Sequence, residues 1–189
     1  MRVDAREVVV RGGRRAVVRA GETGDGGALR AYVLGLAETS DQIITEPNEV
    51  GSVETYRERL GRVSPGRGEL WLVAESSDAP VRAGGVIVGD CVLRVPERHK
   101  LAHNATIGMG VAEGWRGVGL GREMLASAVA WARAHPALER LELSVLHTNT
   151  AGMKLYTRLG FEREGRQVGR IRQADGSYAD EILMGLRVG

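Results

Sequence analysis

The sequence has little cysteine, few aromatic residues and no long hydrophobic run. Cys91 is its one cysteine, which excludes an intrachain disulfide and a cysteine-rich metal cluster, and we expect this thiol to be buried and inert. No apolar run approaches the ~20 residues of a membrane-spanning helix, so we expect no contact with a membrane. Residues 1–6 lack the apolar stretch of a secretory signal, and we therefore expect a cytoplasmic protein.

An excess of charge of one sign is also lacking. The 26 cationic residues nearly balance the 24 anionic ones, and the net charge of +2 argues against nucleic acid as a partner. No predicted helix carries two histidines at the spacing of metal ligands, so we expect no metal. The four histidines are His99, His103, His135 and His147.

What is present is the composition of a folded globular protein. Hydrophobic residues make up 43% of the chain and charged residues 26%, and no repeat or low-complexity segment divides it. We expect a single domain over residues 1–189. Residues 1–14 are interpreted as an N-terminal arm, in which Val8 to Val10 could pair with the edge of a sheet.

Apolar periodicity and turn residues predict an α+β fold, with a mixed and mostly antiparallel twisted sheet of about seven strands flanked by about four helices. Helices are predicted from Asp25 through Leu36, from Ser52 through Leu60, from Leu120 to His135, and from Thr148 or Asn149 to Leu159. Strands are predicted over residues 15–19, 70–75, 81–95, 105–111, 141–145, 161–172 and 178–186, the last two forming a hairpin around Asp175-Gly176.

The most informative segment is Arg116-Gly117-Val118-Gly119-Leu120-Gly121, between a predicted short strand and the predicted long helix. Glycine at alternate positions lets the backbone turn tightly and direct several N–H groups into one concavity, to which the helix N-terminus adds partial positive charge. These features suit a pyrophosphate, and Arg116 or Arg122 could pair with a phosphate. The alternative is a turn that only packs the helix against the strand.

Two other phosphate-binding motifs fail on spacing. A Walker A loop ends in Gly-Lys-Ser/Thr, whereas Gly121 is followed by Arg122. The dinucleotide pattern G-x-G-x-x-G, begun at Gly117 or Gly119, would need its third glycine at Arg122 or Met124. A nucleoside triphosphate and a dinucleotide are therefore not expected as ligands.

The segment resembles the acyl-CoA loop of the GNAT superfamily of N-acetyltransferases. Arg116, Gly119 and Gly121 match the pattern Arg/Gln-x-x-Gly-x-Gly/Ala in register. Residues 149–161 resemble the second signature of this family, N-x-x-A-x-x-L-Y-x-x-x-G-F. The matching residues are Asn149, Leu155-Tyr156 and Gly160-Phe161. The close similarity covers residues 105–161, and the predicted elements outside it follow the order of the family fold.

The resemblance implies the GNAT fold and acetyl-CoA as co-substrate. Met109, Gly110 and Val111 would bind the pantetheine arm through their backbone, with a bulge that frees an N–H to polarise the thioester carbonyl. Asn149 would hydrogen-bond the pantetheine or acetyl end, and Tyr156 would lie near the sulfur as the general acid. The residues expected to hold the pyrophosphate are Arg116, Gly117, Val118, Gly119, Leu120, Gly121 and Arg122.

The transfer also needs a base, because an alkylamine is protonated at neutral pH. The candidates are Glu38 at the end of the first predicted helix, His103 before the cofactor strand and Glu181 in the last strand. Each could instead be a solvated or hydrogen-bonded side chain. Cys91 has no flanking histidine and is not expected to act as a nucleophile.

We therefore predict an N-acetyltransferase that moves an acetyl group from acetyl-CoA directly to the primary amine of a small amine, an amino acid or an antibiotic-like compound. The alternatives are a protein N-terminal or lysine acetyltransferase and a non-catalytic acyl-CoA-binding regulatory module. The acidic residues between Glu38 and Glu58 either attract a cationic amine or form a solvated surface. A homodimer is expected from the resemblance.

Overall fold

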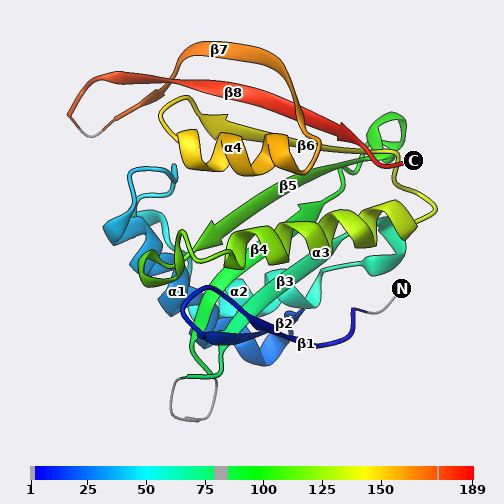
Figure 1. Ribbon diagram of the computed structural model, residues 1–189. Helices are drawn as coiled ribbons and strands as arrows, with labels where there is room; N and C mark the ends of the chain where they lie inside the picture. Colours follow the sequence, from blue (N-terminus) through cyan, green and yellow to red (C-terminus); the bar gives the residue numbers. More distant parts are fainter. Residues whose placement is uncertain (1–2, 79–84, 174) are drawn as a thin grey trace.

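The computed structural model describes residues 3–78, 85–173 and 175–189 (Figure 1). The strands are β1 (Arg6–Val9), β2 (Arg15–Ala20), β3 (Leu70–Ser76), β4 (Ile87–Arg94), β5 (Asn104–Val111), β6 (Arg140–Leu146), β7 (Glu162–Arg172) and β8 (Tyr178–Arg187). The α-helices are α1 (Gly26–Thr39), α2 (Val53–Gly61), α3 (Leu120–Ala134) and α4 (Thr150–Arg158). Short 3-10 turns connect several of these elements, among them η1 (Thr23–Asp25) and η5 (Glu113–Trp115).

The described strands form one sheet in the order β1-β2-β3-β4-β5-β6-β8-β7. Strands β5 and β6 pair in parallel, and the other neighbouring strands pair antiparallel. This confirms the predicted mixed, mostly antiparallel sheet with four helices. The sheet has one strand more than the seven predicted. This strand is β1, from the N-terminal arm, which pairs with β2 at the sheet edge as the apolar Val8 and Val9 suggested.

Helices α1 and α2 cover one face of the sheet, and α3 and α4 cover the other (Figure 1). On the first face, Leu29 and Tyr32 of α1 pack on Trp71 of β3. On the second face, Leu120 and Met124 of α3 belong to the larger buried cluster, together with side chains from β1 to β6 and from β8. Both helices bury side chains at spacings of three and four residues, which is the periodicity that predicted them.

The helix ends follow the local signals in the sequence. Ser52 caps α2 by accepting a hydrogen bond from the Thr55 N–H at 3.2 Å, and Asn149 caps α4 by accepting one from the Gly152 N–H at 2.8 Å. Helix α4 ends before Gly160, whose φ of 93° requires the left-handed conformation that glycine adopts without strain. The predicted cap of α4 is therefore confirmed.

The strand predicted over residues 81–95 is shorter than expected. β4 begins at Ile87, and residues 81–84 lie outside the described part of the chain. The pairing of β3 with β4 has a register shift between Ala74 and Glu75, directly after the first residue of β4. The hairpin of β7 and β8 was predicted correctly, with Gly176 at a φ of 83° in its turn.

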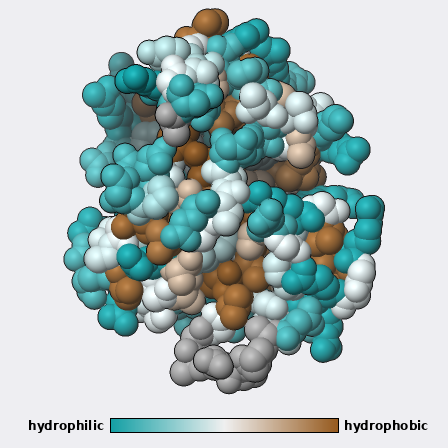
Figure 2. Space-filling view, turned by 90° about the vertical axis from the view of Figure 1, so that its left-hand side faces the viewer, coloured by the Kyte–Doolittle hydropathy of each residue, from teal (hydrophilic) through white to brown (hydrophobic). Residues whose placement is uncertain are grey.

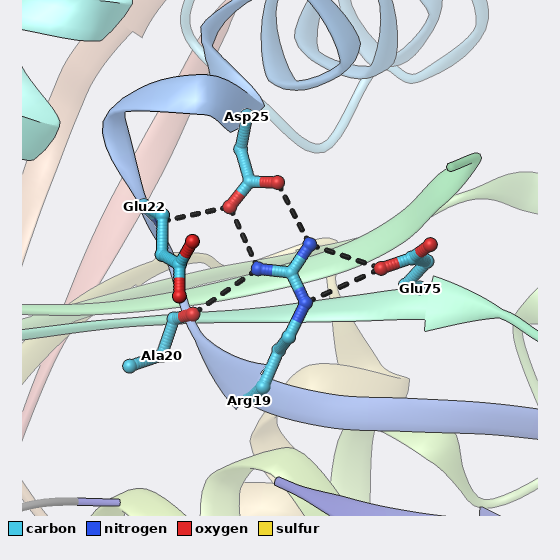
Figure 3. Close-up of polar contacts among 5 residues, drawn as sticks. All are labelled: Arg19, Ala20, Glu22, Asp25 and Glu75. Carbon is cyan, nitrogen blue, oxygen red and sulfur yellow. Dashed lines mark hydrogen bonds and ion pairs between the residues drawn. The ribbon is translucent and has the colours of Figure 1, made fainter. Parts of the chain in front are cut away.

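A partly buried ion-pair network fastens β2 to β3 and to the start of α1 (Figure 3). The Arg19 guanidinium donates two hydrogen bonds of 2.7 Å to Asp25 and bonds of 2.9 and 3.2 Å to Glu75. Although burial by itself raises the pKa of Asp25, hydrogen bonds from Arg19 and from the Glu22 N–H lower it below its ordinary value. Asp25 therefore stays ionised in the folded protein at neutral pH.

Candidate active site

The candidate site lies where β5 and β6 separate. The two strands pair only over Asn104 to Thr106 and Arg140 to Glu142, and then diverge while β5 continues to Val111 and β6 to Leu146 (Figure 1). Beyond Thr106, the edge of β5 that faces β6 has no strand partner. Its N–H groups are therefore available to a ligand, because unpaired backbone donors must be satisfied in some other way, whereas the Val111 carbonyl accepts a hydrogen bond from Arg116 Nε at 2.9 Å.

The separation opens a cavity of about 870 Å³. Figure 2 views the molecule from this side, where apolar side chains gather in hollows bordered by polar ones. The cavity is lined by α1 and the loop after it, the end of β5, the glycine loop and α4. Its lining residues are Arg11, Leu36, Ser40, Gln42, Ile43, Met109, Gly110, Val111, Trp115, Arg116, Gly117, Val118, Gly119, Gly121, Arg122, Asn149, Ala151, Gly152, Lys154, Leu155, Tyr156, Arg158 and Leu159. The structure thus gathers the sequence-predicted cofactor residues around one space, except that Leu120 turns into the core.

The glycine loop has the conformation that its sequence predicts. Gly117 has a φ of 72° and Gly119 a φ of 105°, both in the left-handed region, and Gly119 caps the N-terminus of α3. Gly121 lies in the first turn of α3, where a Cβ would come within 3.2 Å of Met109 Cε. The glycines therefore let α3 begin close to β5, with its unpaired N–H groups at the cavity.

The end of β5 presents N–H groups to the cavity without a bulge. The Ala112 N–H donates to Val88 of β4 at 2.9 Å, and alternation along the strand directs the N–H groups of Met109 and Val111 the other way, into the cleft. The pairing of β4 with β5 is continuous from Arg94 to Gly89, so the bulge implied by the resemblance is absent. The N–H groups are free because β6 diverges from β5.

The paired glycines of β5 have different surroundings. A Cβ on Gly108 would meet open space, whereas one on Gly110 would lie 2.6 Å from Tyr32 Oη and 2.7 Å from Leu36 Cδ1. The missing side chain of Gly110 therefore makes room for α1, on the face of the sheet that α1 and α2 cover.

Two residues of the second motif line the cleft from α4. Asn149 uses its Oδ1 to cap the helix, which leaves its Nδ2 group as a donor. Tyr156 is half-buried and packs edge-on against Phe161, with ring centroids 6.0 Å apart. Burial, with the Cys91 thiol nearby, raises the pKa of Tyr156 to about 12, so its hydroxyl is protonated at neutral pH.

The structure does not bring Glu38 or His103 to the cavity. Glu38 is exposed on the last turn of α1, where Leu36 and Ser40 line the cavity in its place. His103 is exposed just before β5, and the six steps along the strand from His103 to Met109 span about 20 Å. Glu181 lies on β8 and accepts a hydrogen bond from Ser144 at 2.6 Å, on the sheet face away from α3 and α4.

A carboxylate that the sequence analysis did not select lies beneath the end of β5. Asp90 of β4 accepts hydrogen bonds from the Tyr32 hydroxyl at 3.1 Å and from the Trp71 indole at 3.2 Å. Its Oδ1 would lie 3.3 Å from a Cβ on Gly110. Burial raises the pKa of Asp90 to about 6, although the two hydrogen bonds act in the opposite direction. In the sequence, the signal that could have identified Asp90 is a single charged residue within an otherwise apolar strand.

Other chemistry finds little support among the described residues. Cys91 is fully buried, and this burial raises the pKa of its thiol, so it is not an accessible nucleophile. In the part of the chain that the structure describes, no group of three His, Cys, Asp or Glu side chains could hold a metal ion. Within the same residues, no helix is both long enough and apolar enough to cross a bilayer.

The sequence matches known acetyltransferases. Residues 37–161, more than half of the chain, match the profile of the acetyltransferase (GNAT) family. The L-amino acid N-acetyltransferase AaaT of Escherichia coli is 31% identical over 104 residues, or 53% of this chain and 61% of that protein. Mycothiol acetyltransferase of Salinispora tropica is 29% identical over 140 residues, or 74% of this chain and 46% of that protein. The matches thus span about half the length of these curated relatives.

Solved structures share the fold. A GNAT-family acetyltransferase from Streptococcus pneumoniae superposes with a TM-score of 0.83 at 24% identity, covering 92% of this chain and 99% of that one. The acetyltransferase yncA from Salmonella typhimurium, solved with its cofactor acetyl-CoA, superposes with a TM-score of 0.78 at 17% identity, covering 92% and 94%. With the family profile matched across β5, the glycine loop and α4, the chain belongs to the GNAT family of acetyltransferases.

Proposed function

We propose that this protein transfers an acetyl group from acetyl-CoA to the primary amine of a small acceptor such as an amino acid. The observation that carries the proposal is the cleft between β5 and β6, which has free strand N–H groups in its middle, a glycine loop at one end and Tyr156 on its wall. Each part corresponds to one requirement of acetyl transfer from a thioester.

The donor set of the cleft suits acetyl-CoA, which supplies an activated acetyl thioester and a phosphate-rich tail when bound. The N-terminus of α3, with Gly117 and Gly119 in left-handed conformations, offers N–H donors for the pyrophosphate. Arg116 and Arg122 line the same end of the cavity and add positive charge. The N–H groups of Met109 and Val111 would bind the pantetheine arm and stabilise the oxyanion that forms at the carbonyl.

Tyr156 is proposed to donate its proton to the departing thiolate. Its hydroxyl is protonated at neutral pH, because burial raises its pKa to about 12. It lies on α4 across the cleft from the free edge of β5, on the cavity wall. The expected contribution of such a general acid to the rate is on the order of a hundredfold or more.

Asp90 is proposed as the group that finally accepts the proton of the amine. The amine nitrogen becomes acidic as it attacks the carbonyl, and the Tyr32 hydroxyl can take its proton while passing its own to Asp90, 3.1 Å away. Asp90, with a pKa of about 6, is ionised and able to accept this proton at neutral pH. Neither Asp90 nor Tyr32 is on the cavity wall; both lie directly behind Gly110, which is part of that wall.

A small acceptor is favoured by a contact between the segment before α4 and the loop after α1. Thr148 Oγ1, before α4, lies 3.5 Å from Gln42 Oε1, in the loop after α1, so two walls meet there. The acidic residues after α1 support the acceptor less directly. Glu46 and Glu49 form a local capping box, Glu54 pairs with Arg57 of α2, and Glu58 pairs with Arg62 just after α2, as expected for a solvated surface. The similarity to AaaT agrees with an amino acid as acceptor.

The test is thiol release from acetyl-CoA with single amino acids, small amines and peptides compared at equal concentration. The proposal expects release with small amines or amino acids and little with peptides. Release with peptides alone would indicate a protein acetyltransferase, and no release despite acetyl-CoA binding would indicate a regulatory module. Mass spectrometry of the acceptor identifies the acetylated nitrogen.

We also propose that the protein forms a homodimer, as the family resemblance implies. Sedimentation at two protein concentrations tests this. A monomer at both concentrations would contradict it.

A further inference from the structure

The N-terminal hairpin ends beside the glycine loop (Figure 1). The turn between β1 and β2 contains Gly12, with a φ of 85°, and Gly13, with a φ of 75°, so two consecutive left-handed residues make it tight. Next to them, the Arg11 N–H donates a hydrogen bond of 2.9 Å to the carbonyl of Val118. The turn is thus joined through its backbone to the loop that is proposed to bind the pyrophosphate.

Two arginines of the hairpin fasten it on either side of this loop. Arg14 donates a hydrogen bond to the Gly114 carbonyl, and its guanidinium lies 3.9 Å from the centroid of the Trp115 ring. Arg6 lies 3.3 Å from Glu123 in the first turn of α3. These contacts hold the hairpin against the segment before the loop and against the helix after it.

Arg11 itself lines the cavity, as do Arg116, Gly117 and Arg122. Its side chain is exposed, and it has no carboxylate partner among the described residues. Arg15, at the start of β2, has a carboxylate partner, Asp78, at 4.0 Å, and it does not line the cavity. An unpaired guanidinium next to a helix N-terminus is well suited to a phosphate.

We propose that Arg11 binds a phosphate of acetyl-CoA and that the N-terminal hairpin serves to deliver it to the glycine loop. The proposal rests on the proposed function, since it assigns one further ligand to the same co-substrate. It gives the arm a role in binding the donor, and Arg14 and Arg6 act by positioning Arg11.

The test is isothermal titration of acetyl-CoA into the full-length wild type, Arg11→Gln and the matched control Arg15→Gln. A charge-assisted contact with phosphate is worth about a tenfold change in affinity or more. Arg11→Gln should therefore raise the Kd for acetyl-CoA at least tenfold, and Arg15→Gln should leave it within twofold. The effect of Arg11→Gln should shrink as salt is raised, because the side chain is exposed.

Acetylpantetheine, which lacks the nucleotide and its phosphates, provides the second comparison. Wild type and Arg11→Gln should release thiol from it at equal rates, which also shows that the variant is folded. The role of Arg11 would be overturned if the two proteins bound acetyl-CoA with equal affinity. It would also be overturned if Arg11→Gln lost as much turnover with acetylpantetheine as with acetyl-CoA. Either result would leave the proposed function itself unaffected. Failure of the wild type to bind acetyl-CoA would contradict the proposed function together with this proposal.

Discussion

Replacing Arg19 by methionine should destabilise the fold by about 3 kcal/mol. The change removes the paired 2.7 Å bonds to Asp25 and the bonds to Glu75 (Figure 3), while methionine keeps much of the apolar stem of the side chain. Asp25 has only 12% of its side chain exposed, so losing its cation costs about 2 kcal/mol, and the more exposed Glu75, at 32%, adds about 1 kcal/mol.

Arg15→Met provides the matched control on the same strand. Its ion pair with Asp78 is 4.0 Å long, and the two side chains are 56% and 39% exposed, so its loss should cost at most ~0.5 kcal/mol. Urea denaturation of the three proteins, followed by circular dichroism, gives the free energies of unfolding. Equal destabilisation by the two substitutions would refute the reasoning.

The pH dependence of the stability lost by Arg19→Met is a further check. Because the pKa of Asp25 is lowered in the folded state below the ordinary value of 3.8, its pairing stabilises the fold above that value. The contribution is lost as the pH falls through the folded-state pKa. The cost of Arg19→Met should therefore be full at pH 7 and smaller near pH 3, and a cost that grows on acidification would contradict this.

Four other substitutions test the site and the packing beneath it. Tyr156→Phe should lower turnover on the order of a hundredfold and leave the Kd for acetyl-CoA unchanged, and unaltered turnover would reject the general-acid role. The wild-type rate should fall below pH 6, where Asp90 becomes protonated. Asp90→Asn should be slow at every pH and should not show this fall. If the pH–rate profiles of wild type and Asp90→Asn are identical, Asp90 is not the proton acceptor. Gly110→Ala should cost about 1 to 3 kcal/mol in urea denaturation, because its Cβ would meet Tyr32 and Leu36, whereas Gly108→Ala, facing open space, should cost much less; equal costs would contradict the packing described for α1.

The parts of the molecule that could be predicted are those with local signals. The long helix was predicted from the spacing of Leu120, Met124 and Ala128, and all three are buried. The glycine loop was predicted because Gly117 and Gly119 are needed wherever the backbone enters the left-handed region. The family motifs then placed the loop, β5 and α4 around one cleft, and the structure brings them together there.

The remaining features depend on contacts between distant segments. Asp90 meets Tyr32 across 58 positions of sequence, and nothing in the strand around it indicates that partner. Glu38 and His103 were chosen for their chemistry near predicted elements, but the direction of a helix end and the length of a strand leave them outside the cavity. The free N–H groups of β5 arise from the divergence of β6, which appears only once the sheet is assembled.

The most direct test of the account is titration of acetyl-CoA into the purified protein, followed on the same sample by thiol release with and without amine acceptors. We expect micromolar binding and thiol release that depends on the amine. Binding without release for any amine would contradict the catalytic roles proposed for Tyr156 and Asp90. Absence of binding would contradict the assignment of the β5–β6 cleft as the acetyl-CoA site, which is the central claim.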